Sequence, residues 1–315
     1  MSKTISLREV SGLIGITPQG LGKISNKEDS VLKGNSRHFS PAAVRNILKD
    51  RGFTFPKKRI VFHCLKGGAS KTTLAYNSAY RLSQFGAKVL LVDLDKQGNA
   101  TQAFNLDNVD KCFVDVVTGA SSIEETIINV GPHLDVLPST FRNARLEIEL
   151  NNTNYNPKSF YSKIFSSIEE NYDFILFDLP PDLNRNTYLC TIYGDVICIP
   201  TNPDEFAVMG MKMTLESIDS IKEEFEDLNP ETYIVWSKYD ARETNSFHYI
   251  TEFEKISNVN VMPVVIRSDS TFKNAQANRQ SVFELKKKSN AKEDVDILAR
   301  ELSGLREFFT PVGRA

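Results

Sequence analysis

The stretch from Lys66 to Thr73 constrains this chain more than any other, because few local structures use its mixture of glycines, lysines and threonines. It reads Lys66-Gly67-Gly68-Ala69-Ser70-Lys71-Thr72-Thr73 and lies between an apolar run, 60–65, and a helix-like run, 72–85. Glycines let the backbone curl until several N–H groups face one anion, and the following helix adds the positive end of its dipole. The stretch therefore predicts a phosphate-binding loop between a strand and a helix.

Individual residues of this loop have distinct expected roles. Lys71 is expected to reach the β- and γ-phosphate oxygens of a nucleotide, and the Thr72 hydroxyl to complete the shell of a Mg²⁺ ion. Ser70 stands where such loops usually carry a glycine before the lysine. Because positive φ is unfavourable for serine, Ser70 is expected to adopt a conformation that avoids it. Lys66 is additional to the ordinary pattern.

Strand-like and helix-like runs alternate from Arg59 onward. The strand-like runs are 60–65, 88–93, 134–137, 174–177, 196–200, 232–236 and 259–266. They are continuously apolar, so helices should cover both faces of the sheet. The pattern predicts an α/β fold with a doubly wound, mostly parallel sheet over residues 59–315.

Two carboxylate segments follow strand-like runs, at the sheet edge where ligands bind. The segment 93–101 begins with Asp93 and Asp95, and the segment 174–181 has four apolar residues followed by Asp178 and then two prolines. Asp178 is expected to act on Mg²⁺ through a water molecule. A solvated turn is the alternative for 93–101, and its position downstream of a phosphate-binding loop argues against that alternative.

The pattern at 66–73 resembles the deviant Walker A motif of the ParA/MinD family of ATPases. The segment 93–101 is similar to that family's DLDPQGNAT sequence, and 178–181 matches its D-x-P-P. The resemblance implies a nucleotide-sandwiched homodimer in which Lys66 reaches the partner's phosphates, Asp95 orients the attacking water, and Asp93 lies near the metal. It also implies ATP/ADP and Mg²⁺ as cofactors of an ATPase with slow intrinsic turnover. The implied nucleotide-binding residues are Lys66, Gly67, Gly68, Ala69, Ser70, Lys71, Thr72 and Thr73; the catalytic residues are Lys66, Lys71 and Asp95; the metal-binding residues are Thr72, Asp95 and Asp178.

Two later segments resemble further motifs of this family. Residues 236–242 resemble its T-x-Y-D-x-R, with 236–238 less typical, and 264–284 resemble its V-I-P-R segment, with Ile266 in place of proline. The resemblance implies a sequence-independent DNA surface that includes Arg267, Lys273 and Arg279. Ordinary solvated charges are the alternative for each of the three.

Residues 1–55 are predicted to form a small all-α helix-turn-helix domain, joined to the rest by a linker at 53–58. Ser6 and Glu9 form a capping box for a first helix, Gly15 ends it, and Thr17 caps a second. A further helix begins at Ser40 after a polar, basic loop or wing. This order resembles the MerR-like winged-helix DNA readers.

The charge distribution favours DNA as the partner of the N-terminal domain. Residues 1–59 hold 12 Lys and Arg against 4 Asp and Glu, a net charge of +8, whereas residues 60–315 hold 26 against 36, a net charge of −10. A basic end on an acidic body is typical of a chain that contacts nucleic acid at one end. The candidate DNA-binding residues here are Thr17, Gln19, Lys23 and Arg37. The alternative is a helical dimerisation cap with solubilising lysines.

The C-terminal stretch 294–309 has apolar residues at helical spacing. A MinD-type membrane-binding helix is disfavoured because its acidic residues would be repelled by an anionic bilayer, so a final core helix on the sheet is expected. No apolar run approaches the roughly 20 residues of a membrane span, and the N-terminus lacks a signal-peptide stretch. We expect a cytoplasmic, nucleoid-associated protein without a membrane partner.

These features together favour a ParA-type ATPase that segregates a plasmid, phage or chromosomal replicon. Such a protein would bind DNA nonspecifically as an ATP-bound dimer and be stimulated by a ParB-type partner. Its N-terminal domain would bind an operator and repress its own operon. Two alternatives stay open: a nucleotide-switched transcriptional regulator with no segregation role, and a MinD-like positioning ATPase.

Overall fold

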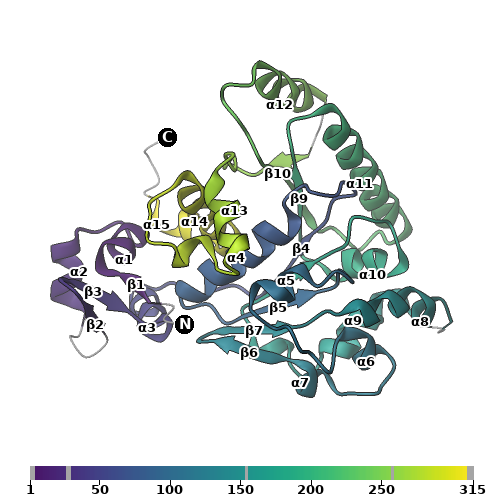
Figure 1. Cartoon of the computed structure of the whole chain (residues 1–315), viewed down its shortest axis with the longest axis horizontal. Coiled ribbons are helices and arrows are strands. Elements are labelled where there is room, and N and C mark those ends of the chain that lie inside the picture. The colour runs from purple at the N-terminus through teal and green to yellow at the C-terminus, as the bar shows by residue number, and fades with distance from the viewer. Residues whose placement is uncertain (1–3, 26–29, 153–154, 257–258, 311–315) are drawn as a thin grey trace.

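The computed structural model describes residues 4–25, 30–152, 155–256 and 259–310, and an eight-stranded sheet forms the centre of this part of the chain (Figure 1). The strand order is β11-β10-β9-β4-β8-β5-β7-β6. The pairings are parallel except that of β6 with β7, which confirms the predicted mostly parallel sheet. The strands are β4 (Lys58–Phe62), β5 (Val89–Asp93), β6 (Ile128–Gly131), β7 (Leu134–Leu137), β8 (Phe174–Asp178), β9 (Val196–Thr201), β10 (Glu231–Trp236) and β11 (Asn260–Val261).

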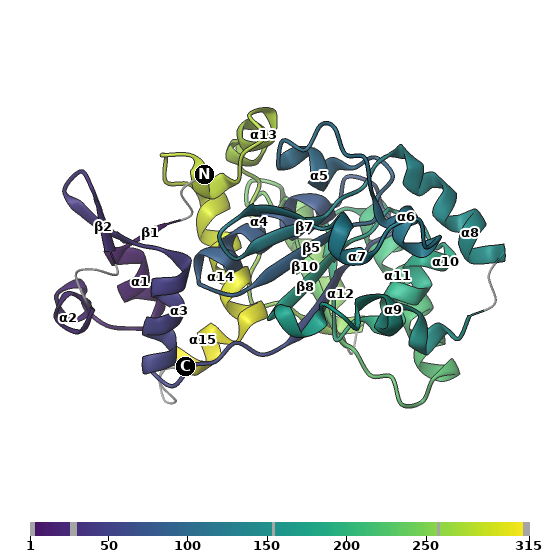
Figure 2. The ribbon, with the colours of Figure 1, turned by 90° about the horizontal axis from the view of Figure 1, so that it is seen from below.

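Helices cover both faces of the sheet, as the continuously apolar strands predicted. Alternate residues of one strand face opposite sides, so that Ile60 and Phe62 of β4 join one buried cluster and Val61 joins the other. The first cluster includes α4 (Lys71–Gln84) and α14 (Asn290–Ser303). The second includes α9 (Pro157–Phe165), α10 (Arg185–Tyr193) and α11 (Glu205–Glu224). Figure 2 shows the two groups on opposite sides of the strands. The remaining helices of this region are α5 (Asn99–Ala103), α6 (Phe113–Val117), α7 (Ile123–Thr126), α8 (Leu146–Asn152), α12 (Thr244–Ile256), α13 (Ser270–Ala277) and α15 (Leu305–Phe309).

The two edges of the sheet differ from the sequence-based expectation. The run predicted as a strand at 259–266 forms only the two-residue strand β11, because Pro263 follows closely and has no N–H to donate to a ladder. At the opposite edge, the unpredicted strand β6 pairs antiparallel with β7. Neither difference affects the central strands that carry the loop and the carboxylates.

The part of the chain before β4 is called here the N-terminal lobe, and β4 with the residues after it the body. The lobe contains the three predicted helices. Helices α1 (Leu7–Leu13), α2 (Pro18–Ile24) and α3 (Pro41–Asp50) start after Ser6, Thr17 and Ser40, whose side chains accept hydrogen bonds from backbone N–H groups of the first turn. The capping box of Ser6 with Glu9 is present. Local capping chemistry therefore located all three helices correctly.

The expectation that this lobe is all-α is wrong. Strands β1 (Ile5–Ser6), β2 (Ser30–Lys33) and β3 (Ser36–Phe39) form an antiparallel sheet in the order β1-β3-β2. A two-residue turn at Gly34, which has a φ of +59°, closes the β2–β3 hairpin. The strands are short and largely exposed, so they carry little of the apolar alternation that identifies strands in a sequence.

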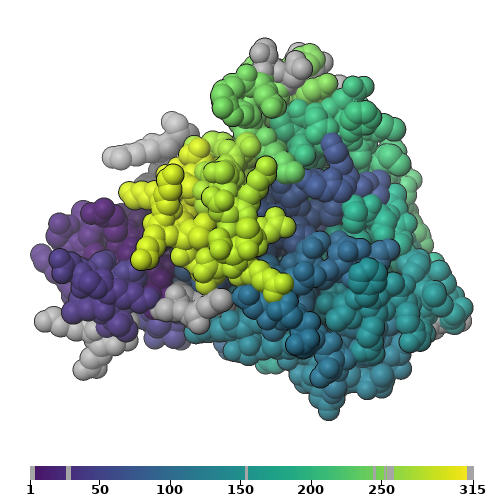
Figure 3. Space-filling model, viewed as in Figure 1, coloured from purple at the N-terminus to yellow at the C-terminus, as the bar shows by residue number. Residues whose placement is uncertain are grey.

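The lobe is packed directly on the body of the protein (Figure 3). Phe53 and Phe55 are buried in the cluster that also contains α1 and α4, so the segment that joins the lobe to the body is packed against the protein and is not a free tether. Gly86, after α4, permits this close packing. A Cβ atom there would lie 2.6 Å from the carbonyl oxygen of Pro41 in α3.

Two arginines fasten the lobe to the body. Arg45 of α3 donates hydrogen bonds to the Gly86 carbonyl at 2.9 Å and to both carboxylate oxygens of Asp173 at 2.5 and 3.0 Å. Arg81 of α4 is buried and binds Glu9 of α1 at 3.1 Å and Asp296 of α14 at 2.5 Å. The helix that follows the phosphate-binding loop therefore contacts the lobe through an ion pair between the buried Arg81 and the partly exposed Glu9.

The C-terminal stretch forms two helices and not one. Gly304 adopts a φ of +75° and ends α14, after which α15 turns toward the lobe. The apolar side of α14 packs on α4 and belongs to the buried cluster that includes residues of the sheet, which confirms the expected core helix. Within the described residues, no helix combines the length and apolar character needed to cross a membrane.

Candidate nucleotide-binding site

The predicted loop connects β4 to α4, and two residues with positive φ give it its curvature. Gly68 has a φ of +74° and Ser70 a φ of +73°. The expectation that Ser70 avoids positive φ is therefore wrong. Residues other than glycine hold this conformation where surrounding contacts fix it, and the Ser70 hydroxyl lies 3.3 Å from the hydroxyl of Ser237, which follows β10.

Lys71 is buried at the base of the loop. Its ammonium donates hydrogen bonds to the carbonyl oxygens of Cys64 at 2.9 Å and Lys66 at 3.1 Å. Burial lowers the pKa of Lys71, and the nearby Cys64 and Asp178 oppose that shift. A cation that has lost much of its water and binds only carbonyl dipoles gains most from an anionic oxygen. Lys71 is thus placed to bind a phosphate group entering the loop.

Lys66 contacts a residue far away in the sequence. Its ammonium lies 2.6 Å from a carboxylate oxygen of Asp204, which caps the N-terminus of α11, and both side chains are partly exposed. Burial alone raises the pKa of Asp204, but the hydrogen bonds from Lys66 and from the Ala207 N–H outweigh it and leave the pKa below its usual value. In this structure the additional lysine is paired within its own chain.

Two carboxylates lie side by side at the ends of adjacent parallel strands. Asp93 of β5 and Asp178 of β8 are direct neighbours in the sheet register, and both are buried. Asp93 accepts hydrogen bonds from the Thr101 N–H and hydroxyl and from the Asp95 N–H, so it holds the 93–101 loop in shape. Burial raises the pKa of Asp93 despite these hydrogen bonds.

Asp178 differs from Asp93 because, among the described residues, no group makes a hydrogen bond of regular geometry to either of its carboxylate oxygens, although the Thr72 hydroxyl lies nearby. Burial first, and then the neighbouring Asp93, raise its pKa well above the usual value, while the Thr72 hydroxyl and Lys71 act in the opposite direction. A buried carboxylate without a partner is costly, and a hydrated divalent cation would satisfy it. The residues present therefore fit Mg²⁺, with Asp178 and Thr72 on one side of the loop.

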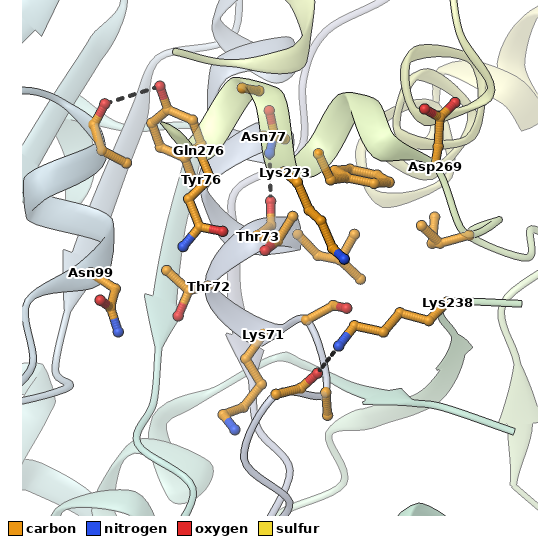
Figure 4. A pocket seen from close by; sticks show the side chains of 18 of the residues that line it. Lys71, Thr72, Thr73, Tyr76, Asn77, Asn99, Lys238, Asp269, Lys273 and Gln276 are labelled. Carbon is orange, nitrogen blue, oxygen red and sulfur yellow. Dashed lines mark hydrogen bonds between the residues drawn. The ribbon is translucent and has the colours of Figure 1, made fainter. Parts of the chain in front are cut away.

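A cavity of about 430 Å³ extends from the loop along the first turns of α4. Its lining includes Asp95, Asn99, Lys238 and Phe272. Figure 4 shows Lys71 pointing into the base of the loop, while Lys238 reaches the loop from the opposite side of the cavity. The size and polarity of the cavity suit a small ligand that carries phosphate groups.

The structure places the three predicted basic residues of the DNA surface in different environments. Arg267 binds Asp294 at 2.5 Å, and Arg279 binds Asp107 at 2.5 Å. Lys273 is exposed on α13 and lines the cavity beside the phosphate-binding loop (Figure 4). Their role in DNA binding stays a prediction.

In the N-terminal lobe, three of the candidate residues lie on or beside α2. Thr17 accepts a hydrogen bond from the Gly20 N–H at 3.1 Å, and Gln19 and Lys23 are exposed. Arg37 lies on β3, where its Nε donates to the Ser30 hydroxyl at 3.0 Å and its guanidinium lies over the Phe39 ring. Helix α2 and the β2–β3 hairpin thus present polar groups on the same lobe.

The sequence analysis did not assign Asp204, Ser237 or Lys238 to the site. Asp204 lies 138 positions after Lys66, and no local pattern connects the two. Ser237 and Lys238 were noted only as departures from a resembled motif. The signal available in the sequence was that two separate motifs are each atypical, the first at Ser70 and the second at Ser237 and Lys238.

A family model described as an AAA domain matches residues 57–233, more than half of the chain. The sporulation initiation inhibitor protein Soj of Bacillus subtilis is 28% identical over 242 residues, which cover 76% of this chain and 95% of Soj. A ParA family protein of Mycoplasma pneumoniae is 31% identical over 191 residues, which cover 56% of this chain and 69% of that protein.

Solved structures share the fold. A plasmid partition protein of Borrelia burgdorferi, bound to AMPPNP, superposes with a TM-score of 0.66 at 21% identity and covers 79% of this chain and 99% of its own. The septum site-determining protein MinD of Pyrococcus horikoshii, complexed with Mg-ADP, gives a TM-score of 0.64 at 21% identity and covers 81% of this chain and 100% of its own. The loop geometry, the paired strand-end carboxylates and these similarities lead to one conclusion: the chain belongs to the ParA family of P-loop ATPases.

Proposed function

We propose that this protein hydrolyses ATP with Mg²⁺ and uses the resulting nucleotide cycle to partition a replicon by binding DNA as a dimer. The observation that carries the proposal is the combination of a curved P-loop that lines a cavity, buried Lys71 in that loop, and the buried carboxylate of Asp178, which has no hydrogen-bond partner among the described residues. The relatives and structural neighbours support the same reading, because they include a plasmid partition protein with an ATP analogue and a MinD with Mg-ADP.

Different groups of this chain would bind different parts of the nucleotide and its metal ion. The P-loop amides and the Lys71 ammonium bind the phosphates, and Lys71 exchanges the carbonyl oxygens of Cys64 and Lys66 for anionic oxygens. The Thr72 hydroxyl and Asp178, the latter through water, would hold Mg²⁺, which would supply charge neutralisation to the phosphate oxygens. Asp95, at the rim of the cavity, orients the attacking water.

Lys66 would supply the link between nucleotide binding and dimerisation. It is tied to Asp204 at the surface, so it can leave that carboxylate for a phosphate presented by a second subunit without exposing a buried charge. The exchange replaces one ion pair by another and costs little when both partners are partly solvated. Slow turnover in the absence of a partner follows if hydrolysis depends on completing this two-subunit site.

The N-terminal lobe would give the dimer its sequence-specific contact with DNA. In this proposal α1, α2 and the β2–β3 hairpin act as a winged helix-turn-helix, and the net charge of +8 on residues 1–59 supports contact with nucleic acid. Operator binding and repression of its own operon are the proposed consequences. Nonspecific, nucleoid-associated binding would use basic residues of the body, with a ParB-type protein stimulating hydrolysis and release.

Sedimentation with ADP, ATP and a slowly hydrolysed analogue, with and without random-sequence DNA, tests this function together with ATPase turnover. We expect a dimer with ATP or the analogue, cosedimentation with DNA in that state, and slow turnover that DNA and a ParB-type partner accelerate. Nucleotide binding without turnover, together with operator footprints alone, would overturn the partition function in favour of a transcriptional regulator. Cosedimentation with liposomes that requires residues 293–309 would instead indicate a MinD-like protein.

A further inference from the structure

Three residues that depart from the patterns described above lie together in the structure. Ser70 replaces the glycine before the P-loop lysine, and Ser237 and Lys238 occupy the less typical positions after β10. The side chains of Ser237 and Lys238 both contact the backbone of the P-loop. We propose that Ser237 and Lys238 are positioning residues that hold the P-loop in its anion-binding conformation before any nucleotide arrives, and that Ser70 is tolerated because of them.

Ser237 is fully buried, and its hydroxyl lies at the centre of a small polar network. Its Oγ is 3.3 Å from the Ala69 carbonyl oxygen, 3.3 Å from Ser70 Oγ and 3.1 Å from Asn202 Oδ1. A serine hydroxyl has one proton and two lone pairs, so it can donate to one neighbour while accepting from the Ser70 hydroxyl. The network thereby ties the P-loop to the segments that follow β9 and β10.

Lys238 makes a charged contact with the peptide group between Gly68 and Ala69, one position before the peptide group that Ser237 contacts. Its ammonium donates a hydrogen bond of 2.6 Å to the Gly68 carbonyl oxygen (Figure 4). Lys238 itself has a φ of +55°, so Ser237 has two non-glycine neighbours with left-handed backbone: Ser70 by hydrogen bond and Lys238 along the chain. Strained conformations of this kind persist where surrounding structure over-determines them and are concentrated at functional sites.

Peptide geometry shows what these contacts do for the loop. In a trans peptide the C=O and the N–H of the next residue point in opposite directions. Lys238 holds the Gly68 carbonyl and Ser237 approaches the Ala69 carbonyl, so the amide N–H groups of Ala69 and Ser70 are both turned away from these two side chains. Two of the donors that a P-loop offers to phosphate are thus fixed in direction, which reduces the ordering required on binding.

The inference rests on the proposed nucleotide site, but its first test needs no nucleotide. Hydrogen exchange of the Ala69 and Ser70 amides is measured in the ligand-free full-length protein for wild type, Lys238→Met and Ser237→Ala. We expect exchange at these amides to rise about tenfold in both variants, as loss of one hydrogen bond allows, and to return toward wild type in Lys238→Arg. Lys287→Met, an exposed lysine elsewhere, is the matched control. Unchanged exchange in both variants would overturn the proposal.

A second measurement separates positioning from general stability. Lys238→Met should weaken nucleotide binding about tenfold while leaving kcat within about twofold at saturation, because the clamp acts before binding. Ser237→Ala should weaken binding less in a Ser70→Gly background, since glycine adopts positive φ without support. An equal effect of Ser237→Ala in both backgrounds would contradict the role given to Ser70. If wild type itself fails to bind nucleotide, the proposed function fails while the exchange result still decides the clamp.

Discussion

The buried guanidinium of Arg81, in the helix that follows the P-loop, binds the carboxylate of Glu9 in the N-terminal lobe at 3.1 Å. The same arginine binds Asp296 of α14 at 2.5 Å and lies between the rings of Phe85 and Phe283. Three parts of the chain that are distant in sequence therefore meet at one side chain.

Arg81→Ala should destabilise the protein by about 2 to 3 kcal/mol, because it removes a buried guanidinium packed over two rings and its charged hydrogen bonds, while Glu9 can be solvated and Asp296 keeps Arg300. Chemical denaturation monitored by tryptophan fluorescence and by circular dichroism measures the loss. Arg145→Ala provides the control: it removes an exposed pair with Glu149 and should change stability by less than about 0.5 kcal/mol. Equal effects of the two substitutions would contradict the assignment of Arg81 as a structural junction.

The two lysines of the P-loop should separate binding from dimerisation. Lys71→Ala should weaken ATP binding at least about a hundredfold, because it removes the buried cation of the loop. Lys66→Ala should change affinity by less than about tenfold and yet lose the ATP-dependent dimer. Calorimetry and sedimentation measure the two quantities. Lys212→Ala, an exposed lysine on α11, should change neither, and a normal ATP-bound dimer of Lys66→Ala would refute the cross-subunit role.

Asp178→Asn should abolish hydrolysis and at the same time stabilise the nucleotide-free protein by about 1 to 3 kcal/mol at neutral pH. The reason is that Asp178 is buried without a hydrogen-bond partner and its pKa is raised. A group with a raised acid pKa binds its proton more readily in the folded state, so its destabilising effect is greatest at high pH and fades as pH falls. Thermal melting of both proteins at several pH values should show the advantage of asparagine shrinking in acid.

His63 should make the folded protein less stable as the pH falls, which is the opposite of the effect of Asp178. It is buried beside the P-loop, and burial followed by the nearby Lys71 lowers its pKa to about 4. Below pH 6.5 the unfolded chain takes up a proton that the folded chain refuses, so stability should fall by about 3 kcal/mol between pH 6.5 and about 4. Comparing wild type with His63→Leu across this range isolates the effect. A difference in unfolding free energy that does not vary with pH would show that His63 binds its proton equally well in the folded and unfolded states, which would contradict the lowered pKa.

Sequence features that depend on neighbouring residues were predicted well. The caps at Ser6, Thr17 and Ser40 and the alternation of strands and helices follow from hydrogen bonds and apolar spacing within a few residues. The P-loop and Asp178 were also located, because the P-loop follows one strand and Asp178 ends another, and both strands are recognisable as continuous apolar runs.

Features that depend on distant partners were not predictable. The positive φ of Ser70 is supported by Ser237, 167 positions later, and Lys66 is paired with Asp204 across 138 positions. The β2–β3 hairpin was missed because each strand has only four residues and β2 is mostly exposed, so the apolar alternation that marks a strand in a sequence is too short to recognise. Burial of Phe53 and Phe55 likewise depends on the body against which they pack.

That burial has a consequence for how the proposed dimer would meet DNA. A lobe attached by a free tether could reach half-sites at many separations, whereas this lobe is seated through Phe53, Phe55 and the close approach at Gly86. The distance between the two recognition helices of a dimer is then fixed by the fold, and it determines the spacing of the operator half-sites that the dimer can bind. Lengthening the segment at 53–58 would unseat the lobe before it widened that spacing.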